Sequence, residues 1–437
     1  MYNQVSKLLL YSDLGSDSIL KNLCEIFEGF DEGKLNKSKA VKQIYSEIKK
    51  LLDLSTIYGF NKNLWQNYLT FLIITNENSF SLTCERVGAS KGGSVNLLAI
   101  KDFEIFRNLL HYDFTHIEEQ LGIDCFSIIT DYKAIPKRDC LYNKGVSAKV
   151  NEISDLISSA ENGEEIFSII TQHYSQYGVG MFGLNRAFRI SATDNGVEFC
   201  PVSNADTVRL CDLVGYESQK QELLDNTKAF AEGKKANNVL LYGDSGTGKS
   251  TSIKAVLNEF YDQGLRMIEI YKHQFRELST IISQIKNRNY RFIIYIDDLS
   301  FEENEIEYKF LKAVIEGGVE TRPENVLIYA TSNRRHLIKE TWNDRNDMEF
   351  NGDIHRSDTM EEKLSLSSRF GVTINFSTPD RQEYHDIVKT LAKNEGIDMD
   401  EEKLCYLANR WEIRHGGVSG RTARQFIDYL AGKGEEQ

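Results

Sequence analysis

The glycine-rich segment GDSGTGKS, residues 243–250, carries the clearest chemical signal in this sequence. A short apolar run at residues 239–242 precedes it, and apolar residues at helical spacing, Ile253, Val256 and Leu257, follow it. A strand, a glycine-rich loop and a helix in this order let backbone N–H groups curl around a phosphate, with the positive end of the helix dipole behind them. A glycine-rich turn without a ligand is the disfavoured alternative. The pattern therefore predicts a phosphate-binding loop for ATP.

Two side chains of this loop have specific predicted roles. Lys249 is expected to reach the β- and γ-phosphate oxygens, and the Ser250 hydroxyl is expected to bind Mg²⁺. The residues predicted to contact ATP in this segment are Gly243, Asp244, Ser245, Gly246, Thr247, Gly248, Lys249, Ser250 and Thr251.

A second motif, FIIYIDD at residues 292–298, is an apolar run that ends in two carboxylates. Asp297 is placed to bind Mg²⁺, usually through water. Asp298 is the candidate base that polarises the attacking water, although Glu fills this role more often. A helix N-cap after a strand is the alternative explanation for the pair. The two motifs together predict an ATP site that contains Mg²⁺.

The elements around these motifs alternate between two periodicities. Apolar, β-rich runs separated by helical patterns imply buried strands in a mainly parallel sheet with helices on both faces, an α/β fold. Beyond Pro379 the pattern is helical through Leu430, which predicts a small helical lid. The predicted strands are residues 239–242, 267–270, 292–296, 326–330 and 372–376.

The N-terminal part is predicted to be mostly helical, because apolar residues recur there at 3.6-type spacing. Residues 80–98 and 125–135 are left undecided between helix and strand. The turn sequence Asp194-Asn195-Gly196 predicts a hairpin that closes this part. We therefore expect three domains, which are residues 1–200, 201–378 and 379–437. No catalytic constellation is legible in residues 1–176, so we expect a partner-binding surface there.

Composition limits the classes of function. The 437 residues are 41% hydrophobic and 27% charged, as in a folded protein with more than one core. A net charge of -13 disfavours bulk nucleic-acid binding. The seven cysteines include no C-x-x-C pair and signal neither a disulfide framework nor a zinc site. No apolar stretch approaches about 20 residues, so we expect a cytoplasmic protein that does not span a membrane.

Residues 212–430, about half of the chain, resemble the AAA+ superfamily of P-loop ATPases in the order of their motifs. The segment DLVGYE, residues 212–217, is similar to the part of that fold that lies under the adenine. This resemblance implies that Val214, Gly215 and Tyr216 contact the base, with an ordinary turn as the alternative.

Three further segments extend the resemblance. The segment IYATSN, residues 328–333, looks like the sensor 1 strand, in which Asn333 would hold the lytic water; a capping role is the alternative. The segment LSLSSRF, residues 364–370, looks like the end of the arginine-finger helix. A finger at Arg369 would reach the γ-phosphate of a neighbouring subunit, which implies a homo-oligomer; a surface salt bridge is the alternative.

The lid carries the last of these segments, GVSGRTARQ at residues 417–425. It resembles the start of the sensor 2 helix, with Arg421 as the better match and Arg424, one turn later, in reserve. The chain is most similar to an uncharacterised bacterial family of AAA+ ATP-binding proteins, a likeness that could extend over the N-terminal half. It departs from the family pattern at Ser368, where an acidic residue is expected before the finger. The segments that carry this closer likeness are DDLSFE at 297–302, EEKLSL at 361–366 and SGRTARQ at 419–425.

Two functions from different classes remain open. In the first, ATP hydrolysis at subunit interfaces remodels or loads a protein or nucleoprotein partner that the N-terminal domain binds. In the second, the protein is a slow-turnover, nucleotide-dependent switch or adaptor that recruits a partner. A small-molecule kinase is disfavoured, because the sensor and finger segments resemble those of a machine.

Binding of single-stranded nucleic acid is a further, less favoured possibility. Basic residues interleaved with aromatic ones suit it, although charge runs on helices are usually solvated faces. An acidic stretch at residues 342–359 is interpreted as an insertion loop and not as a metal cluster. Tyr271 or Phe275 could line a pore, with core packing favoured. The basic residues of the candidate face are Lys272, His273, Arg276, Lys286, Arg288, Arg291, Arg334, Arg335 and His336, with Tyr271, Phe275 and Tyr290 near them.

Overall fold

The computed structural model divides the chain into two compact units. The first comprises Met1–Asn185 with Pro201–Asn204, and the second comprises Arg186–Cys200 with Ala205–Gln437. Among the described helices, none is long and apolar enough to cross a membrane. The structure describes residues 1–15, 17–89, 93–134, 144–193, 196–203, 205–301, 305–316, 323–333, 337 and 366–433.

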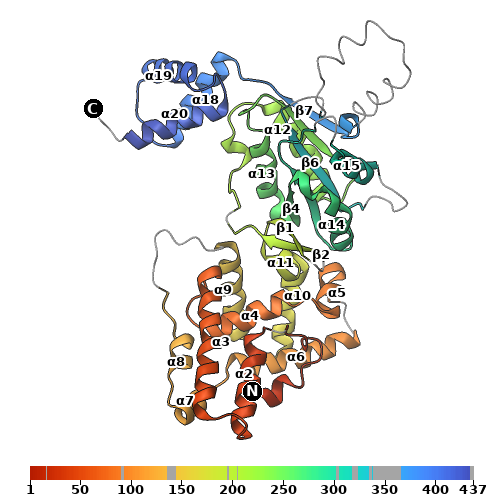
Figure 1. Cartoon of the computed structure of the whole chain (residues 1–437), viewed down its shortest axis with the longest axis vertical. Coiled ribbons are helices and arrows are strands. Elements are labelled where there is room, and N and C mark those ends of the chain that lie inside the picture. Colours follow the sequence, from red (N-terminus) through yellow and green to blue (C-terminus); the bar gives the residue numbers. More distant parts are fainter. Residues whose placement is uncertain are drawn as a thin grey trace. The chain divides into compact units, whose positions relative to one another are not determined.

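The first unit is built from helices, as predicted (Figure 1). Side-chain caps mark many of their ends: Asn36 accepts the N–H of Lys39 at the start of α3, and Gly59 ends that helix with a φ of 65°. Most described residues of the undecided segments are helical, in α5, α6 and α8, although residues 131–134 are not and Tyr132 forms an isolated β-bridge with Lys62. The helices are α1 (Tyr2–Val5), α2 (Ile19–Asp31), α3 (Lys37–Tyr58), α4 (Leu64–Thr75), α5 (Ser79–Val87), α6 (Ser94–Leu110), α7 (Thr115–Leu121), α8 (Cys125–Thr130), α9 (Lys144–Ser158), α10 (Gly163–Tyr177) and α11 (Gly180–Leu184).

The second unit contains a seven-stranded sheet in the order β2-β1-β4-β5-β6-β3-β7. The pairs β1–β4, β4–β5, β5–β6, β6–β3 and β3–β7 are all parallel. All five predicted strands are present. The strands are β1 (Ala187–Thr193), β2 (Gly196–Pro201), β3 (Val239–Gly243), β4 (Leu265–Ile270), β5 (Arg291–Ile296), β6 (Val326–Ser332) and β7 (Val372–Phe376).

Helices cover both faces of this sheet, because its apolar strands are buried on both sides (Figure 1). Val239 and Leu241 pack with Leu223 of α12 and Val256 of α13, whereas the intervening Leu240 is buried outside that cluster. The helices α14 and α15 lie on the other face (Figure 1). These elements are η1 (Leu210–Asp212), α12 (Glu217–Ala231), α13 (Lys249–Phe260), η2 (Tyr261–Gln263), η3 (Lys272–Glu277), α14 (Leu278–Ile285) and α15 (Glu307–Glu316).

The segment expected to form a hairpin of the N-terminal domain lies in a different unit. Strand β1 pairs with β4 in the register Phe188↔Ile268, and β2 is its neighbour, so both extend the sheet of the second unit. The first compact unit thus runs to Asn185 and also includes Pro201–Asn204, whereas the first domain was expected to comprise residues 1–200. The turn residues 194 and 195 lie outside the described residues. The turn sequence predicted two paired strands, but a turn signal alone does not specify the sheet that they join.

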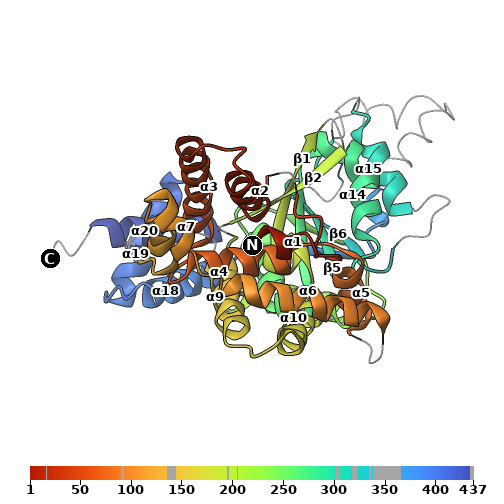
Figure 2. The ribbon, with the colours of Figure 1, turned by 90° about the horizontal axis from the view of Figure 1, so that it is seen from below.

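Three C-terminal helices, here called the lid, lie next to one another in both views (Figure 1, Figure 2). They are α18 (Arg381–Asn394), α19 (Glu401–Arg414) and α20 (Gly420–Lys433). Asp380 caps α18 by accepting the N–H of Glu383, whose carboxylate accepts the N–H of Asp380 in return. This capping box fixes where the chain turns from β7 into the lid.

Candidate nucleotide-binding site

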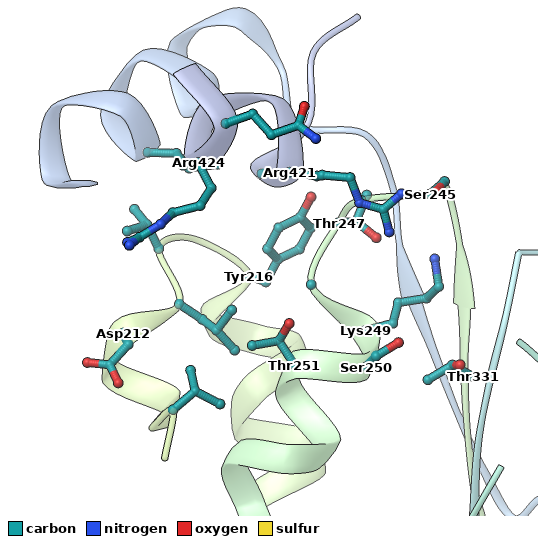
Figure 3. Close-up of a pocket in the computed structure, with 18 of the residues that line it drawn as sticks. Asp212, Tyr216, Ser245, Thr247, Lys249, Ser250, Thr251, Thr331, Arg421 and Arg424 are labelled. Atoms are coloured by element: carbon teal, nitrogen blue, oxygen red, sulfur yellow. Dashed lines mark hydrogen bonds between the residues drawn. The ribbon is translucent and has the colours of Figure 1, made fainter. Parts of the chain in front are cut away.

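The predicted site residues converge on a cavity of about 730 Å³ at the carboxyl ends of β3, β5 and β6, where loops in parallel sheets commonly bind ligands. The lid contributes one wall of it (Figure 3). The lining residues are Val208, Asp212, Leu213, Val214, Tyr216, Ser245, Gly246, Thr247, Gly248, Lys249, Ser250, Thr251, Asp297, Asp298, Thr331, Asn333, Ile387, Leu391, Gly420, Arg421, Arg424 and Gln425.

The glycine-rich loop curls around the Lys249 side chain. Lys249 Nζ donates hydrogen bonds to the carbonyl oxygens of Gly243, at 2.9 Å, and Asp244, at 2.5 Å. Burial lowers the pKa of Lys249 from its ordinary value, although the carboxylates of Asp244, Asp298 and Asp297 oppose this effect. The ammonium group is thus held at the floor of the pocket, where it can move to a phosphate. Gly243 and Asp244 themselves are not among the lining residues.

Ser250 and Asp297 form the predicted metal-binding pair. The Ser250 hydroxyl donates to Asp297 Oδ1 at 2.7 Å, and the Thr331 hydroxyl donates to the same oxygen at 2.6 Å. Burial would raise the pKa of Asp297, but the hydrogen bonds from Thr331 and Ser250 outweigh it and leave that pKa below its ordinary value. Asp297 is therefore held as a carboxylate, the form that binds a cation.

Asp298 turns away from Asp297 and towards β6. Its backbone has a positive φ of 50°, and its N–H donates to Thr331 Oγ1 at 2.9 Å. Asn333 Nδ2 donates to Asp298 Oδ1 at 2.9 Å, so the predicted base and the predicted sensor are in contact. Thr331 links both acidic residues, a role that the sequence analysis missed. Its position at the end of the predicted strand 326–330, two residues before Asn333, was the available signal.

The pocket is largely apolar at the end where the sequence predicted contacts to the adenine base. Of the three predicted base contacts, Val214 and Tyr216 line the cavity and Gly215 does not. Tyr216 adopts a left-handed backbone conformation with a φ of 60° at the start of α12, and its ring packs on Phe376 at 5.1 Å between centroids. Leu391 of α18 adds an apolar side chain from the lid. A flat, apolar base could be enclosed between these surfaces.

The two lid arginines have different surroundings. Arg421 extends towards the glycine-rich loop, with Nη1 3.5 Å from Ser245 Oγ (Figure 3). Its backbone N–H donates to the Gly246 carbonyl at 3.1 Å. Arg424 instead forms ion pairs with Glu395, at 2.7 Å, and Asp428, at 3.0 Å. Both line the cavity, but Arg421 is the one aimed at the phosphate-binding loop.

Arg369 does not line the cavity of its own chain. Its side chain, 28% exposed, pairs with Glu316 at the end of α15. Its Nε is buried, with no hydrogen-bond partner among the described residues. Glu316 thus supplies a carboxylate although Ser368 stands where an acidic residue was expected. The Arg369 guanidinium is therefore partly satisfied by Glu316 and partly accessible to solvent.

The basic residues proposed for nucleic acid are largely engaged with protein groups. Lys272 forms an ion pair with Glu305, and Arg291 donates to the Glu324 carbonyl at 2.9 Å. Phe275 is 1% exposed, so it packs in the core, whereas Tyr271 is 42% exposed. Residues 334–336 and the acidic stretch 342–359 lie outside the described residues. In the described part of the chain, no group of three or more His, Cys, Asp or Glu residues could hold a metal ion.

The sequence model of a family described as a protein of unknown function, DUF815, matches residues 184–434, more than half of the chain. The chain belongs to the DUF815 family. The match begins at residue 184 and therefore covers the second unit. The expected extension of the family likeness over the N-terminal half lies outside this matched region.

Several named proteins are also similar to this DUF815 protein. The protein Ycf2 of Mesostigma viride is 25% identical over 253 residues, which are 52% of this chain and 27% of the relative. The chain therefore spans about a quarter of the length of this curated relative, 27%. Among solved structures, the RuvB Holliday junction branch migration motor of Thermotoga maritima is 16% identical, over 50% of this chain and 63% of that chain, with a TM-score of 0.35. The FIGL-1 AAA domain in complex with ADP is 18% identical, over 52% and 74%, with a TM-score of 0.36.

The predicted fold class is confirmed. The DUF815 protein has an α/β core with a mainly parallel sheet and a glycine-rich loop after β3, together with a mostly helical N-terminal part and a helical lid. The glycine-rich loop follows β3, which lies between β6 and β7. This order brings the acidic pair, the sensor strand and the link to the lid around one loop.

Proposed function

We propose that this protein binds ATP in the cavity between the sheet and the lid and hydrolyses it with the help of Mg²⁺. One observation carries the proposal: Ser250 of the glycine-rich loop and Asp297 of the acidic pair meet at 2.7 Å, beside Lys249. Segments nearly 50 residues apart therefore bring a hydroxyl, a carboxylate and an ammonium group to one end of the pocket. P-loop NTPases hold Mg²⁺ and the β- and γ-phosphates with this combination.

The residues present suit Mg²⁺. Both Ser250 and Asp297 offer oxygen atoms, the ligands that this hard cation prefers, and Asp297 is kept ionised. When bound, Mg²⁺ neutralises charge on the β- and γ-phosphates. Lys249 would bind the same phosphates from the floor of the pocket, after releasing the carbonyl oxygens that it now contacts.

Asp298 and Asn333 are proposed to act on the attacking water. The carboxylate of Asp298 accepts a proton from that water as it attacks the γ-phosphorus, and the Asn333 amide orients it. Their mutual hydrogen bond keeps both side chains on the side of the pocket that faces β6. Arg421, aimed at Ser245, would add positive charge when the lid closes on the γ-phosphate.

We further propose that hydrolysis takes place between subunits of a cytoplasmic homo-oligomer, with Arg369 acting on the ATP of a neighbour. Arg369 is absent from the lining of its own cavity, and its side chain is 28% exposed although Nη1 pairs with Glu316. The work of this cycle would be to remodel or load a protein or nucleoprotein partner, bound by the helical first unit.

A second function is favoured by one observation. The candidate base is an aspartate, shorter than glutamate, and its carboxylate accepts a hydrogen bond from Asn333. A base held in this way would turn over slowly, which suits a switch that recruits a partner in its ATP state.

The two functions are separated by ATP hydrolysis measured over a range of protein concentrations, with R369A in parallel. Specific activity that rises with concentration and collapses in R369A supports the assembled machine. ATP binding with flat, negligible turnover supports the switch. A protein that binds no nucleotide would rule out both.

A further inference from the structure

Asp244 contacts both the phosphate-binding lysine and the segment that leads into the lid. Its main-chain carbonyl accepts a hydrogen bond from Lys249 Nζ at 2.5 Å. Its carboxylate points to the other side, where Oδ2 accepts from Thr378 N at 2.8 Å and from Thr378 Oγ1 at 2.7 Å. Its own N–H donates to the Phe376 carbonyl at 3.1 Å. One residue is therefore bonded to the floor of the pocket and to the chain beyond β7.

That chain, residues 376–378, is here called the hinge segment. Strand β7 ends at Phe376, and the lid begins with the Asp380 cap of α18. On the base-proximal side, Tyr216 donates from its hydroxyl to the Ser377 carbonyl at 2.8 Å. The hinge segment is thus held from the phosphate end by Asp244 and from the base end by Tyr216.

The loop and the hinge segment are too close to move independently. Gly243 has a φ of 130°, and a Cβ atom at this position would clash with the Phe376 carbonyl. A displacement of the loop backbone here must displace the end of β7 as well. The lid also returns to the loop, because the Arg421 N–H donates to the Gly246 carbonyl. The loop is therefore bonded both to the segment that precedes the lid and to the first turn of α20.

We propose that Asp244 is a positioning residue that transmits phosphate binding to the lid through Thr378, an inference that rests on the proposed ATP site. To bind phosphate oxygens, Lys249 must give up its hydrogen bonds to the Gly243 and Asp244 carbonyls. The Asp244 carbonyl then keeps only the hydrogen bond from the Thr247 hydroxyl, at 2.8 Å, among the described residues. With one of its two donors gone, the Asp244 peptide can rotate about this remaining bond, and its carboxylate carries that rotation to the hinge segment. The lid consequently takes a different position with nucleotide bound, and ATP changes it more than ADP does.

The competing explanation is that Asp244 only stabilises the hinge segment. Loss of its carboxylate would then lower stability but leave the response of the lid to nucleotide intact. The two explanations differ in one measurable quantity, the change in hinge and α18 amide exchange when nucleotide binds.

The test is hydrogen exchange of the full-length protein over residues 376–394, without nucleotide, with ADP and with a slowly hydrolysed ATP analogue. The wild type should show a nucleotide-dependent change that is larger with the analogue. D244A should lose most of this change, because it removes both hydrogen bonds between the loop carboxylate and Thr378. D244N keeps an acceptor oxygen and should recover part of the response.

A second variant, T378V, allows the test even if D244A does not fold. T378V removes one of the two donors and should reduce the response partially. The double variant should behave like D244A alone, because both changes remove the same link. T390V is the matched control, since its hydroxyl bonds only within α18, to the Asp386 carbonyl at 2.8 Å.

The outcomes separate the two proposals. If wild-type protein binds no ATP, or K249A binds it equally well, the proposed function fails and this inference fails with it. If Lys249-dependent binding is present but the lid response is absent in the wild type, or undiminished in D244A, only the inference is overturned. A loss in T390V equal to that in T378V would also overturn it.

Discussion

Asn333 donates a hydrogen bond of 2.9 Å to Asp298, so the ends of β6 and β5 are joined by the two side chains proposed to control the attacking water. Thr331 adds a second bridge, because its hydroxyl accepts the N–H of Asp298 and donates to Asp297. A substitution at the end of either strand should therefore alter the hydrogen bonds of both carboxylates.

For Asp298, the informative change is D298N. The amide oxygen can still accept the hydrogen bond from Asn333, so ATP binding should be kept. Hydrolysis should fall about a hundredfold or more, the usual contribution of a general base. Single-turnover hydrolysis and nucleotide retention after gel filtration measure the two effects. Turnover at the wild-type rate would dismiss Asp298 as the base.

Lys249 is predicted to provide most of the affinity for phosphate. K249A removes a charged donor and should weaken ATP binding by about tenfold to a hundredfold. Calorimetry of ATP and ADP binding measures this directly. K228A, which removes an exposed lysine of α12 that does not line the cavity, is the control and should bind normally. Equal affinity of K249A and wild type would contradict the assignment of the loop.

Arg369 should matter for hydrolysis and not for binding within one chain. R369A should leave ATP affinity unchanged at low protein concentration and slow hydrolysis by about a thousandfold, the lower range for an arginine finger. Activity is followed as the protein concentration is raised. R410A removes an exposed lid arginine and should have no such effect. If R369A retains full, concentration-dependent activity, hydrolysis does not need this residue.

The two lid arginines give a matched pair of variants. Arg421 is aimed at the glycine-rich loop, whereas Arg424 is paired with Glu395 and Asp428. R421A should therefore lower ATP affinity relative to ADP, and R424A should mainly lower the stability of the lid. Parallel titrations with both nucleotides, together with thermal unfolding, distinguish the two. The reverse pattern would assign the sensor role to Arg424.

Protonation of Asp297 should lower the free energy of unfolding at acid pH. Its pKa is lowered from 3.8 in the folded state, so its hydrogen bonds stabilise the protein fully above about pH 4 and are lost as pH falls through the lower folded pKa. D297N should lower the free energy of unfolding at pH 7 by about 1 kcal/mol. It should also make that free energy depend less steeply on pH in the acid range. Urea unfolding between pH 3 and pH 7 measures both. If the free energy of unfolding of D297N falls with acid pH as steeply as that of the wild type, other carboxylates cause the pH dependence.

Much of the second unit could be predicted because its signals are local. The apolar run before GDSGTGKS and the one before Asp297 each fill a buried strand, and a polar residue at the end of such a strand lies at the same sheet edge as its neighbours. The position of Lys249, Ser250, Asp297, Asp298 and Asn333 around one cavity follows from this rule.

Other features depend on contacts between distant segments, which periodicity does not contain. The bond from Asp244 to Thr378 spans 134 residues, and the pair Arg369–Glu316 depends on how α15 ends. The segment 125–130 is rich in β-branched and aromatic residues, yet it forms α8 because Glu118 accepts the N–H groups of Phe126 and Ser127. A tertiary carboxylate overrides local propensity here.

The pairing of β1 with β4 determines where the chain can be cut. A fragment that starts at residue 201 would contain the whole ATP cavity but would lack β1 and β2, and would leave the N–H and C=O groups of β4 along Met267, Ile268 and Glu269 without a neighbour. An unprotected edge of this kind pairs with other chains, so we expect that fragment to aggregate on expression. A fragment that starts before Arg186 keeps β1 and β2 paired beside β4 and should not aggregate.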